Sequence, residues 1–205
     1  DVFDTWATSS LTPLLATGWL DDRDLFEKVY PMDLRPQGHD IIRTWLFSTV
    51  VRSHLLTDSL PWKGASINGW ILDPDRKKMS KSKGNVVTPI DLLEKYGSDG
   101  VRYWAARARQ GADTAFEEGQ MKIGRRLAIK ILNASKFALG FGEVASDPEG
   151  ALPADPAAVT EPLDRAMLAS LASVVDQASA AMAKLDYARA IEVIEPFFWT
   201  FCDDY

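Results

Sequence analysis

The spacing of the apolar residues changes near Thr88, and this change constrains the fold more than any other feature of the chain. Before Thr88, short apolar runs alternate with turns. The run Ala65–Leu72, for example, predicts a strand that ends at the Asp73-Pro74-Asp75 turn. After Thr88, apolar residues recur every three or four positions nearly to the end of the chain, a spacing typical of helices. The sequence therefore predicts an α/β segment followed by an all-α segment.

Turn and capping residues place the individual elements. Thr88 is predicted to cap a helix that begins at Pro89 and ends at Gly97. Pro196 is expected to bend the last helix or to delay its start. The full set of expected elements is a strand over Asp1–Trp6, a helix over 38–56, a strand over 65–72, helices over 89–97, 98–109, 118–141, 163–185 and 187–205, and a surface linker over about 146–162. In the helix over 118–141 the residues expected to face inward are Ile123, Leu127, Ile131, Ala134 and Ala138.

Composition restricts the kind of protein and its compartment. The 205 residues include one cysteine and two histidines, too few for a four-ligand zinc site or an internal disulfide, so we expect no protein-bound metal and a reducing, cytoplasmic setting. No stretch of eighteen uninterrupted apolar residues occurs, so we expect no membrane span. The first residue is Asp1 rather than methionine, which leads us to expect a piece of a longer protein.

The charge is distributed unevenly. The net charge of −6 argues mildly against a nucleic-acid partner for the chain as a whole. The window 101–136, in contrast, holds eight basic residues and only three acidic ones. The distribution of charge therefore matters more for a nucleic-acid partner than the net charge does.

The most informative segment is "DRKKMSKSKGNVVTP", residues 75–89, with five basic residues among the eight from 76 to 83. It contains no G-x-x-x-x-G-K-[ST] phosphate loop, and a solvated basic loop is the ordinary interpretation of such a run. However, Lys78–Ser82 is identical to the KMSKS motif of class I aminoacyl-tRNA synthetases. Gly84-Asn85 and Thr88-Pro89 also resemble the usual downstream context of that motif. We therefore identify the chain by resemblance as part of such an enzyme.

The resemblance gives these residues roles in binding ATP. In that family a carboxylate attacks the α-phosphate of ATP, and mobile lysines stabilise the charge that develops on the departing pyrophosphate. Lys78 and Lys81 would be the phosphate lysines, and Ser80 a supporting donor. Met79 and the strand residues Ile71 and Leu72 would flank the adenine.

An upstream segment, "RPQGHDIIRTW", resembles the G-x-D-x-x-x-x-W element of the same family. By this resemblance Gly38 lets the backbone approach the ribose of ATP, and Asp40 accepts hydrogen bonds from its hydroxyls. Ile41 and Trp45, four positions apart on an expected helix, would share a face and line the amino-acid pocket. Ordinary core packing is the alternative for Trp45, and His39 is expected to make a local contact only.

The first segment, "DVFDTWATSSLTP", resembles the valyl version of another family element. Trp6 would form a wall of the pocket, and Asp4 would order the loop at the strand end or approach the substrate. Thr5 and the run Thr8-Ser9-Ser10 favour the valyl over the isoleucyl type. A valine site excludes isosteric threonine by no more than ~10² in binding, which is why the family carries an editing domain, expected upstream of Asp1.

The helical half resembles the connecting and anticodon-binding helices of these enzymes. The expected tRNA-binding residues are Arg125, Arg126, Lys130 and Lys136, for which a solvated helix face is the alternative. The aromatic residues from Phe197 to Phe201 are expected in a helix-bundle core rather than stacked on bases. The implied domains are 1–88, the C-terminal part of a Rossmann-like catalytic domain; 89–115, connecting helices; and 116–205, an anticodon-binding helical bundle.

The implied function is valine–tRNA ligation, with ATP and Mg²⁺, valine and tRNA-Val as partners, in a monomeric parent. The H-I-G-H motif of the family does not occur in the chain, so the isolated chain is expected to be inactive. Alternatives are an isoleucyl- or leucyl-type enzyme, and a stand-alone tRNA-binding module. A nucleotidyltransferase with a similar loop is disfavoured by the long helical tail.

Overall fold

The computed structural model describes residues 4–140, 157 and 159–205, and the chain forms two compact units. The first unit comprises 1–71 and 110–114, and the second comprises 72–109 and 115–205. Residues 146–156 and 158 of the predicted linker lie outside the described residues. The two units are groups of residues that contact one another. They do not test the predicted division into three domains, which stays a prediction.

The first unit contains a parallel strand pair. Its elements are α1 (Thr5–Ser9), α2 (Thr12–Ala16), α3 (Arg23–Val29), β1 (Met32–Gly38), the 3-10 turn η1 (His39–Ile41), the π-helical turn η2 (Ile42–Leu46), α4 (Phe47–Thr57) and β2 (Trp62–Asn68). β1 pairs with β2 in parallel, from Met32 opposite Trp62 to Gly38 opposite Asn68. Parallel neighbours need a crossover connection, which η1, η2 and α4 supply. The predicted α/β character of this segment is confirmed.

Two sequence predictions in the first unit need correction. The strand predicted over Asp1–Trp6 is wrong in its described part, because Asp4 caps α1 by accepting a hydrogen bond from the backbone N–H of Trp6 at 2.8 Å. The strand predicted over 65–72 begins earlier, at Trp62, and is interrupted after Asn68. At Gly69 a β-carbon would lie 2.3 Å from the carbonyl oxygen of Ala112, so the strand breaks where two backbone segments touch.

The second unit is mainly helical. It contains the 3-10 turn η3 (Lys81–Lys83), α5 (Pro89–Ala106), α6 (Glu118–Leu139), α7 (Pro162–Ala183) and α8 (Tyr187–Asp203). The short strands β3 (Ile71–Leu72) and β4 (Thr114–Ala115), each of which contains a boundary between the units in the sequence, form a second two-stranded sheet. Inside α5, Gly97 has φ +72° and interrupts the helix, which confirms the predicted end at this residue. Thr88 stands at the N-cap as predicted, but its side chain makes no capping hydrogen bond.

The core of the second unit lies where α5 crosses α6. Leu92 and Tyr96 of α5 and Met121 of α6 are buried, with Val87, Val101, Trp104 and Phe116 packed against them. The helices approach closely at two glycines. A β-carbon at Gly124 would lie 2.4 Å from that of Tyr103, and one at Gly100 would lie 2.7 Å from the carbonyl oxygen of Met121. The first half of α5, which follows the segment 75–88, is thus packed against the start of α6.

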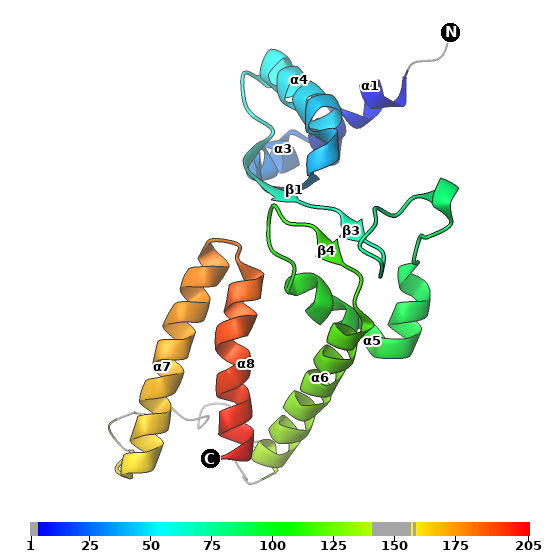
Figure 1. The fold of residues 1–205 in the computed structure, drawn as a ribbon. Helices are drawn as coiled ribbons and strands as arrows, with labels where there is room; N and C mark the ends of the chain where they lie inside the picture. The colour runs from blue at the N-terminus through cyan, green and yellow to red at the C-terminus, as the bar shows by residue number, and fades with distance from the viewer. Residues whose placement is uncertain (1–3, 141–156, 158) are drawn as a thin grey trace. The chain divides into compact units, whose positions relative to one another are not determined.

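α8 is tied to α5 by charged side chains. The hydroxyl of Tyr103 donates to Glu195 at 2.6 Å, and Arg107 lies 3.6 Å from the same carboxylate. Burial, followed by the hydrogen bond to Glu195, raises the pKa of Tyr103. Arg109 forms a second pair with Glu192 at 2.7 Å. α7 runs beside α8 in the opposite direction (Figure 1).

The outer helices differ from expectation in their exposure. Ile131 and Ala138 of α6 are exposed rather than inward, because the described elements cover α6 mainly near its start. Pro196 lies inside α8 without delaying its start at Tyr187.

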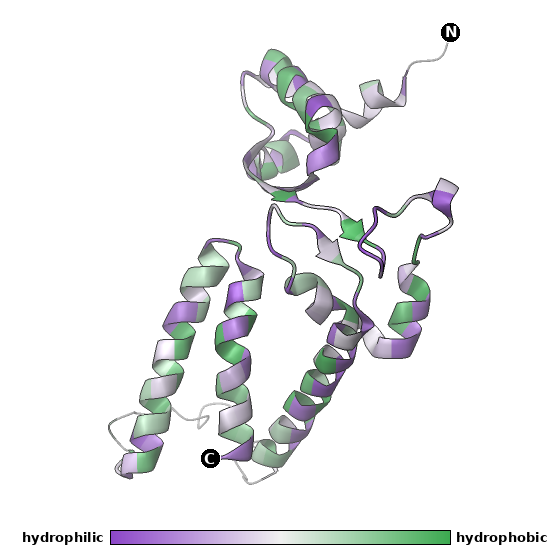
Figure 2. Cartoon of the chain, in the orientation of Figure 1, coloured by the Kyte–Doolittle hydropathy of each residue, from purple (hydrophilic) through white to green (hydrophobic). Residues whose placement is uncertain are grey.

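Hydrophilic and hydrophobic residues alternate along α6, α7 and α8 (Figure 2). By length and composition alone α7 is apolar enough to cross a membrane, but one such helix is weak evidence for a membrane span.

Candidate functional site

The basic segment 75–85 is a loop that begins with a tight turn. The backbone N–H of Asp73 donates to the carbonyl of Lys77 at 2.8 Å, and Leu72 and Lys78 form an antiparallel bridge. Arg76 closes the turn with φ +59°, a left-handed conformation. Lys78 therefore continues directly from a paired backbone, rather than from a loose tail.

A buried carboxylate lies at the base of this loop. The side chain of Asp73 accepts the Nδ2–H of Asn85 at 2.7 Å and the backbone N–H of Lys77 at 2.7 Å, and Asp73 is only 6% exposed. These hydrogen bonds, that of Asn85 first, lower the pKa of Asp73 below its ordinary value. Asp73 is therefore ionised at neutral pH and acts as an acceptor.

The predicted phosphate residues lie on the outer part of the loop. Lys78 and Lys81 are exposed, whereas Met79 and Ser80 are half-buried. Ser80 precedes the turn η3, and its backbone N–H donates to Oδ1 of Asn85 at 2.9 Å. Within the described residues no ion pair involves Lys81. The loop therefore presents lysine ammonium groups to solvent from a backbone that is hydrogen-bonded on both sides, an arrangement suited to an anion.

The predicted ribose residues lie at the carboxyl end of β1. Gly38 ends that strand, and Asp40 follows with an exposed carboxylate. A β-carbon at Gly38 would lie 2.9 Å from Oδ1 of Asp40. His39 contacts the carbonyl of Asn68 at 3.1 Å and the ring of Trp70, and its lack of a catalytic role stays a prediction. Ligands of parallel sheets bind beyond the carboxyl ends of the strands, where Gly38 and Asp40 are found.

Trp45 is part of the packed interior of the first unit. Its Nε1–H donates to the carbonyl of Ser9 at 2.9 Å, and its ring stacks on Trp62 at 5.9 Å between centroids. The guanidinium of Arg35 lies 4.1 Å from the ring centroid. With 7% of its surface exposed, Trp45 has the core packing of the alternative interpretation, and its contact with an amino acid stays a prediction.

The predicted shared face of Ile41 and Trp45 rested on the wrong helix type. Ile41 ends the 3-10 turn η1, and Trp45 lies in the π-helical turn η2. The four-residue spacing of an α-helix therefore does not apply between them. Trp6 is 46% exposed on α1, and Asp4 caps that helix, so the ordering role predicted for Asp4 has a structural basis.

The predicted site residues divide between the two units. Those in the first unit are Asp4, Trp6, Gly38, Asp40, Ile41, Trp45 and Ile71. Those in the second are Leu72, Lys78, Met79, Ser80 and Lys81, together with Arg125, Arg126, Lys130 and Lys136. Asp73 and Asn85 were missed as a site pair. The sequence predicts Asp73 only as part of a turn and Asn85 only as part of the context of the motif.

The predicted tRNA residues on α6 differ in their surroundings. Lys130 pairs with Asp203 at 3.0 Å, and this hydrogen bond raises its pKa. Arg125 donates to the carbonyl of Lys95 at 2.5 Å. Arg126 and Lys136 are exposed, and neither has an ion pair in the part of the chain that the structure describes. Arg126 and Lys136 are thus the more available cations for a phosphate.

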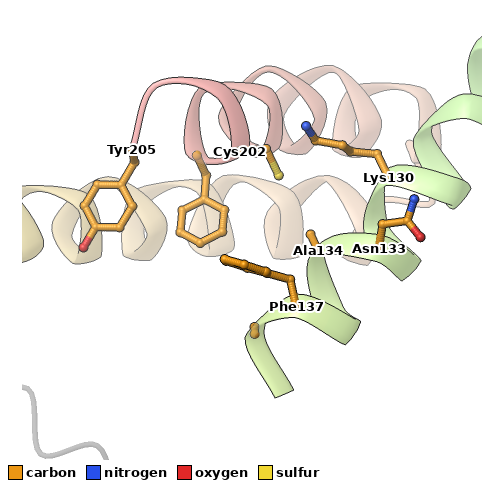
Figure 3. Close-up of a pocket in the computed structure, with 8 residues that line it drawn as sticks. Lys130, Asn133, Ala134, Phe137, Cys202 and Tyr205 are labelled. Carbon is orange, nitrogen blue, oxygen red and sulfur yellow. The ribbon is translucent and has the colours of Figure 1, made fainter. Parts of the chain in front are cut away.

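A pocket of about 640 Å³ lies between α6 and α8. Figure 3 shows Phe137 of α6 near its middle, with Lys130 and Asn133 toward one end and Tyr205 toward the other. Ala134 and Ala138 of α6 and Phe201 and Cys202 of α8 complete its wall. Among residues 4–140, 157 and 159–205, no group of three or more His, Cys, Asp or Glu side chains could hold a metal ion.

Comparison with known proteins identifies the family. Residues 1–117, more than half of the chain, match the family described as tRNA synthetases class I (I, L, M and V). The chain belongs to this family. Over 205 residues it is 71% identical to valine–tRNA ligase of Thermobifida fusca (strain YX) and 65% identical to that of Salinispora tropica (strain ATCC BAA-916 / DSM 44818 / JCM 13857 / NBRC 105044 / CNB-440). In each case it is covered completely and spans 23% of the relative.

Solved structures show the same fold. The ternary complex of Agrobacterium radiobacter K84 agnB2 LeuRS with tRNA and LeuAMS matches 96% of this chain with a TM-score of 0.81, at 20% identity and over 26% of its own length. Mycobacterium tuberculosis methionyl-tRNA synthetase bound by methionyl-adenylate matches 94% with a TM-score of 0.68, at 25% identity and over 37% of its length. The predicted fold, an α/β part followed by helices in a class I synthetase arrangement, is confirmed.

Proposed function

We propose that this chain is the part of a valine–tRNA ligase that carries the ATP-phosphate loop and the beginning of the tRNA-binding helices. The KMSKS sequence, Lys78–Ser82, on a hydrogen-bonded basic loop is the observation that carries this proposal. The identity to valine–tRNA ligases over the full chain supports the choice of valine. ATP with Mg²⁺, valine and tRNA-Val are the proposed partners of a monomeric, cytoplasmic parent.

The first reaction would join valine to AMP. An oxygen of the valine carboxylate attacks the α-phosphorus of ATP, a new P–O bond forms, and the bond to pyrophosphate breaks. Negative charge grows on the departing pyrophosphate, and the ammonium groups of Lys78 and Lys81 stabilise it more in the transition state than in the ground state. A hydroxyl of the terminal ribose of tRNA then attacks the valyl carbonyl and releases AMP.

The residues of the first unit would bind the other parts of the substrates. Asp40 accepts hydrogen bonds from ribose hydroxyls beside Gly38, where no side chain blocks the approach. Met79, Ile71 and Leu72 flank the adenine. Trp6 is the more accessible of the two proposed pocket tryptophans, and Trp45 supports the wall from the interior.

The test is amino-acid-dependent exchange of pyrophosphate into ATP by the full-length enzyme that contains this sequence. We expect exchange with valine, little with isoleucine, and a loss of about 10²–10³ in rate for Lys81→Ala, the scale seen when one oxyanion donor is removed. The isolated 205-residue chain is expected to give no exchange. A preference for isoleucine or leucine would overturn the valine assignment, and undiminished exchange in Lys81→Ala would overturn the role of the loop.

A further inference from the structure

We propose that Asn85 and Asp73 form a positioning pair that holds the KMSKS loop in the shape that presents Lys78 and Lys81. This inference rests on the proposed function, because it concerns the same loop. It assigns a task to two side chains that are given no substrate contact in the proposed function. Their sequence separation of twelve residues is bridged by one hydrogen bond of 2.7 Å.

Asn85 uses both ends of its amide. Its Nδ2 group donates to Asp73 and, at 3.3 Å, to the carbonyl of Lys78. Its Oδ1 accepts the backbone N–H of Ser80 at 2.9 Å. An amide both donates and accepts, whereas an ionised carboxylate only accepts and an ammonium only donates. The amide of Asn85 therefore links the backbone of Lys78 and of Ser80, on either side of Met79, to the buried carboxylate of Asp73, which precedes the loop.

The carboxylate of Asp73 is itself held in place. It accepts the backbone N–H of Lys77, and the backbone N–H of Asp73 donates to the carbonyl of Lys77. Gly84, with φ +66°, turns the chain back so that Asn85 meets Ser80. The loop between Asp73 and Asn85 is thus closed by side-chain hydrogen bonds, whereas Lys78 and Lys81 are exposed.

Closure matters because the lysines act on developing charge. A lysine stabilises a transition state only when its ammonium group stands where the charge develops, and a displacement of about 1 Å can cost roughly 10² in rate. The lysine side chain is long and flexible, so the position of its backbone sets what it can reach. Asn85 and Asp73 fix that backbone and leave the ammonium groups of Lys78 and Lys81 to bind the phosphates.

Exchanging donor and acceptor tests the pair in the full-length enzyme. Asn85→Asp removes the Nδ2–H donor and sets two carboxylates against each other. Asp73→Asn keeps an acceptor for the N–H of Lys77. The double variant Asp73→Asn/Asn85→Asp restores a donor opposite an acceptor with the direction reversed. Asp75→Asn is the matched control, because Asp75 lies in the same turn with an exposed carboxylate.

We expect Asn85→Asp to lower kcat of valine-dependent pyrophosphate exchange by about 10² with the KM for valine unchanged. The double variant should recover most of this loss, and Asp75→Asn should match the unmodified enzyme. In Asn85→Asp one carboxylate of the pair gains a proton as the pH falls, since like charges raise a pKa. Lys77 is the charged side chain that acts on Asp73. The activity of this variant relative to the unmodified enzyme should therefore rise as the pH is lowered.

Two results would overturn the proposal: full activity in Asn85→Asp, or a double variant no better than the worse single variant. Failure of the proposed function looks different, because the unmodified enzyme would then prefer another amino acid. In that case the same four variants are compared with the amino acid that the enzyme does use. A fall in kcat together with rescue would then support the pair independently of valine.

Discussion

At the scale of single residues, one carboxylate joins the two helices of the central crossing. Glu118, in the first turn of α6, accepts hydrogen bonds from Lys95 at 2.8 Å and from the hydroxyl of Tyr96, both on α5. The hydrogen bond between Lys95 and Glu118 is the main cause of a lowered pKa of Glu118 and of a raised pKa of Lys95. Because Tyr96 belongs to the buried core, the charge of Glu118 contributes directly to the packing of α5 on α6.

Replacing Glu118 by glutamine should lower the Tm of the chain at pH 7. A carboxyl group with a lowered folded-state pKa stabilises the fold above its unfolded pKa, and this contribution disappears as the pH falls through the folded value. The Tm difference between Glu118→Gln and the unmodified chain should thus be full above about pH 5 and shrink below the ordinary value of 4.5. Melting curves from pH 7 to pH 3 measure it, with Glu117→Gln as the control. A difference independent of pH would contradict this account.

The sequence predicted residues that carry a motif and missed residues that act through geometry. Lys78 and Lys81 were predicted because the five letters of KMSKS are specific. Asp73 and Asn85 were not paired, because their contact depends on the left-handed turns at Arg76 and Gly84. Trp45 was ambiguous, since a large aromatic residue has the same sequence pattern in a core as in a pocket wall.

At the scale of elements, periodicity predicted the helices but not their closest approaches. The ranges of α5 with its break at Gly97, of α6, α7 and α8 agree with the sequence within a few residues, because each has a long apolar stripe. A stripe does not tell which turn of α6 touches α5. That contact depends on Gly124 and Gly100, whose missing side chains leave no hydrophobic signal. The π-helical turn η2 was missed for a similar reason, because its residues fit an ordinary helix.

Two glycines of the same helix should respond oppositely to alanine. At Gly124 a β-carbon would overlap the side chain of Tyr103, so Gly124→Ala should destabilise the chain by about 1–3 kcal/mol, the usual cost of overpacking. At Gly119 nothing lies within 4 Å, so Gly119→Ala should stabilise it by roughly 0.5–1 kcal/mol through helix propensity. Urea unfolding of both variants measures the difference. Equal shifts would mean that α5 and α6 do not cross closely at Gly124.

At the scale of the whole molecule, the order of α/β and helical parts was predictable, whereas the contact units were not. The first unit includes residues 110–114, which follow α5 in sequence, and no local pattern predicts such a return. The sequence likewise does not predict which charged side chains form ion pairs. The window 101–136 is basic in sequence, but Arg107, Arg109 and Lys130 are occupied by carboxylates of α8. The sequence counted these cations, and only the fold shows which are paired inside the protein.

This distinction gives a prediction for tRNA binding by the 205-residue chain. Arg126→Ala and Lys136→Ala should each weaken binding and reduce the slope of log K against log salt by about 0.7–0.9, since each removes one phosphate contact. Arg23→Ala is the matched control, because Arg23 is an exposed helical arginine in the first unit. Lys78→Ala and Lys81→Ala should leave affinity unchanged if the helices alone bind tRNA.

The measurement is a titration with valine tRNA and with a non-cognate tRNA at two salt concentrations. Salt-sensitive binding that prefers the valine tRNA would place recognition within the helices of this chain. Equal affinity for both tRNAs, still weakened by Arg126→Ala, would mean that α6 positions the backbone while other parts of the enzyme read the sequence. An effect of Arg23→Ala as large as that of Arg126→Ala would contradict a specific role for α6. The pairing of Arg107, Arg109 and Lys130 with the carboxylates of α8 would then have no bearing on where tRNA lies.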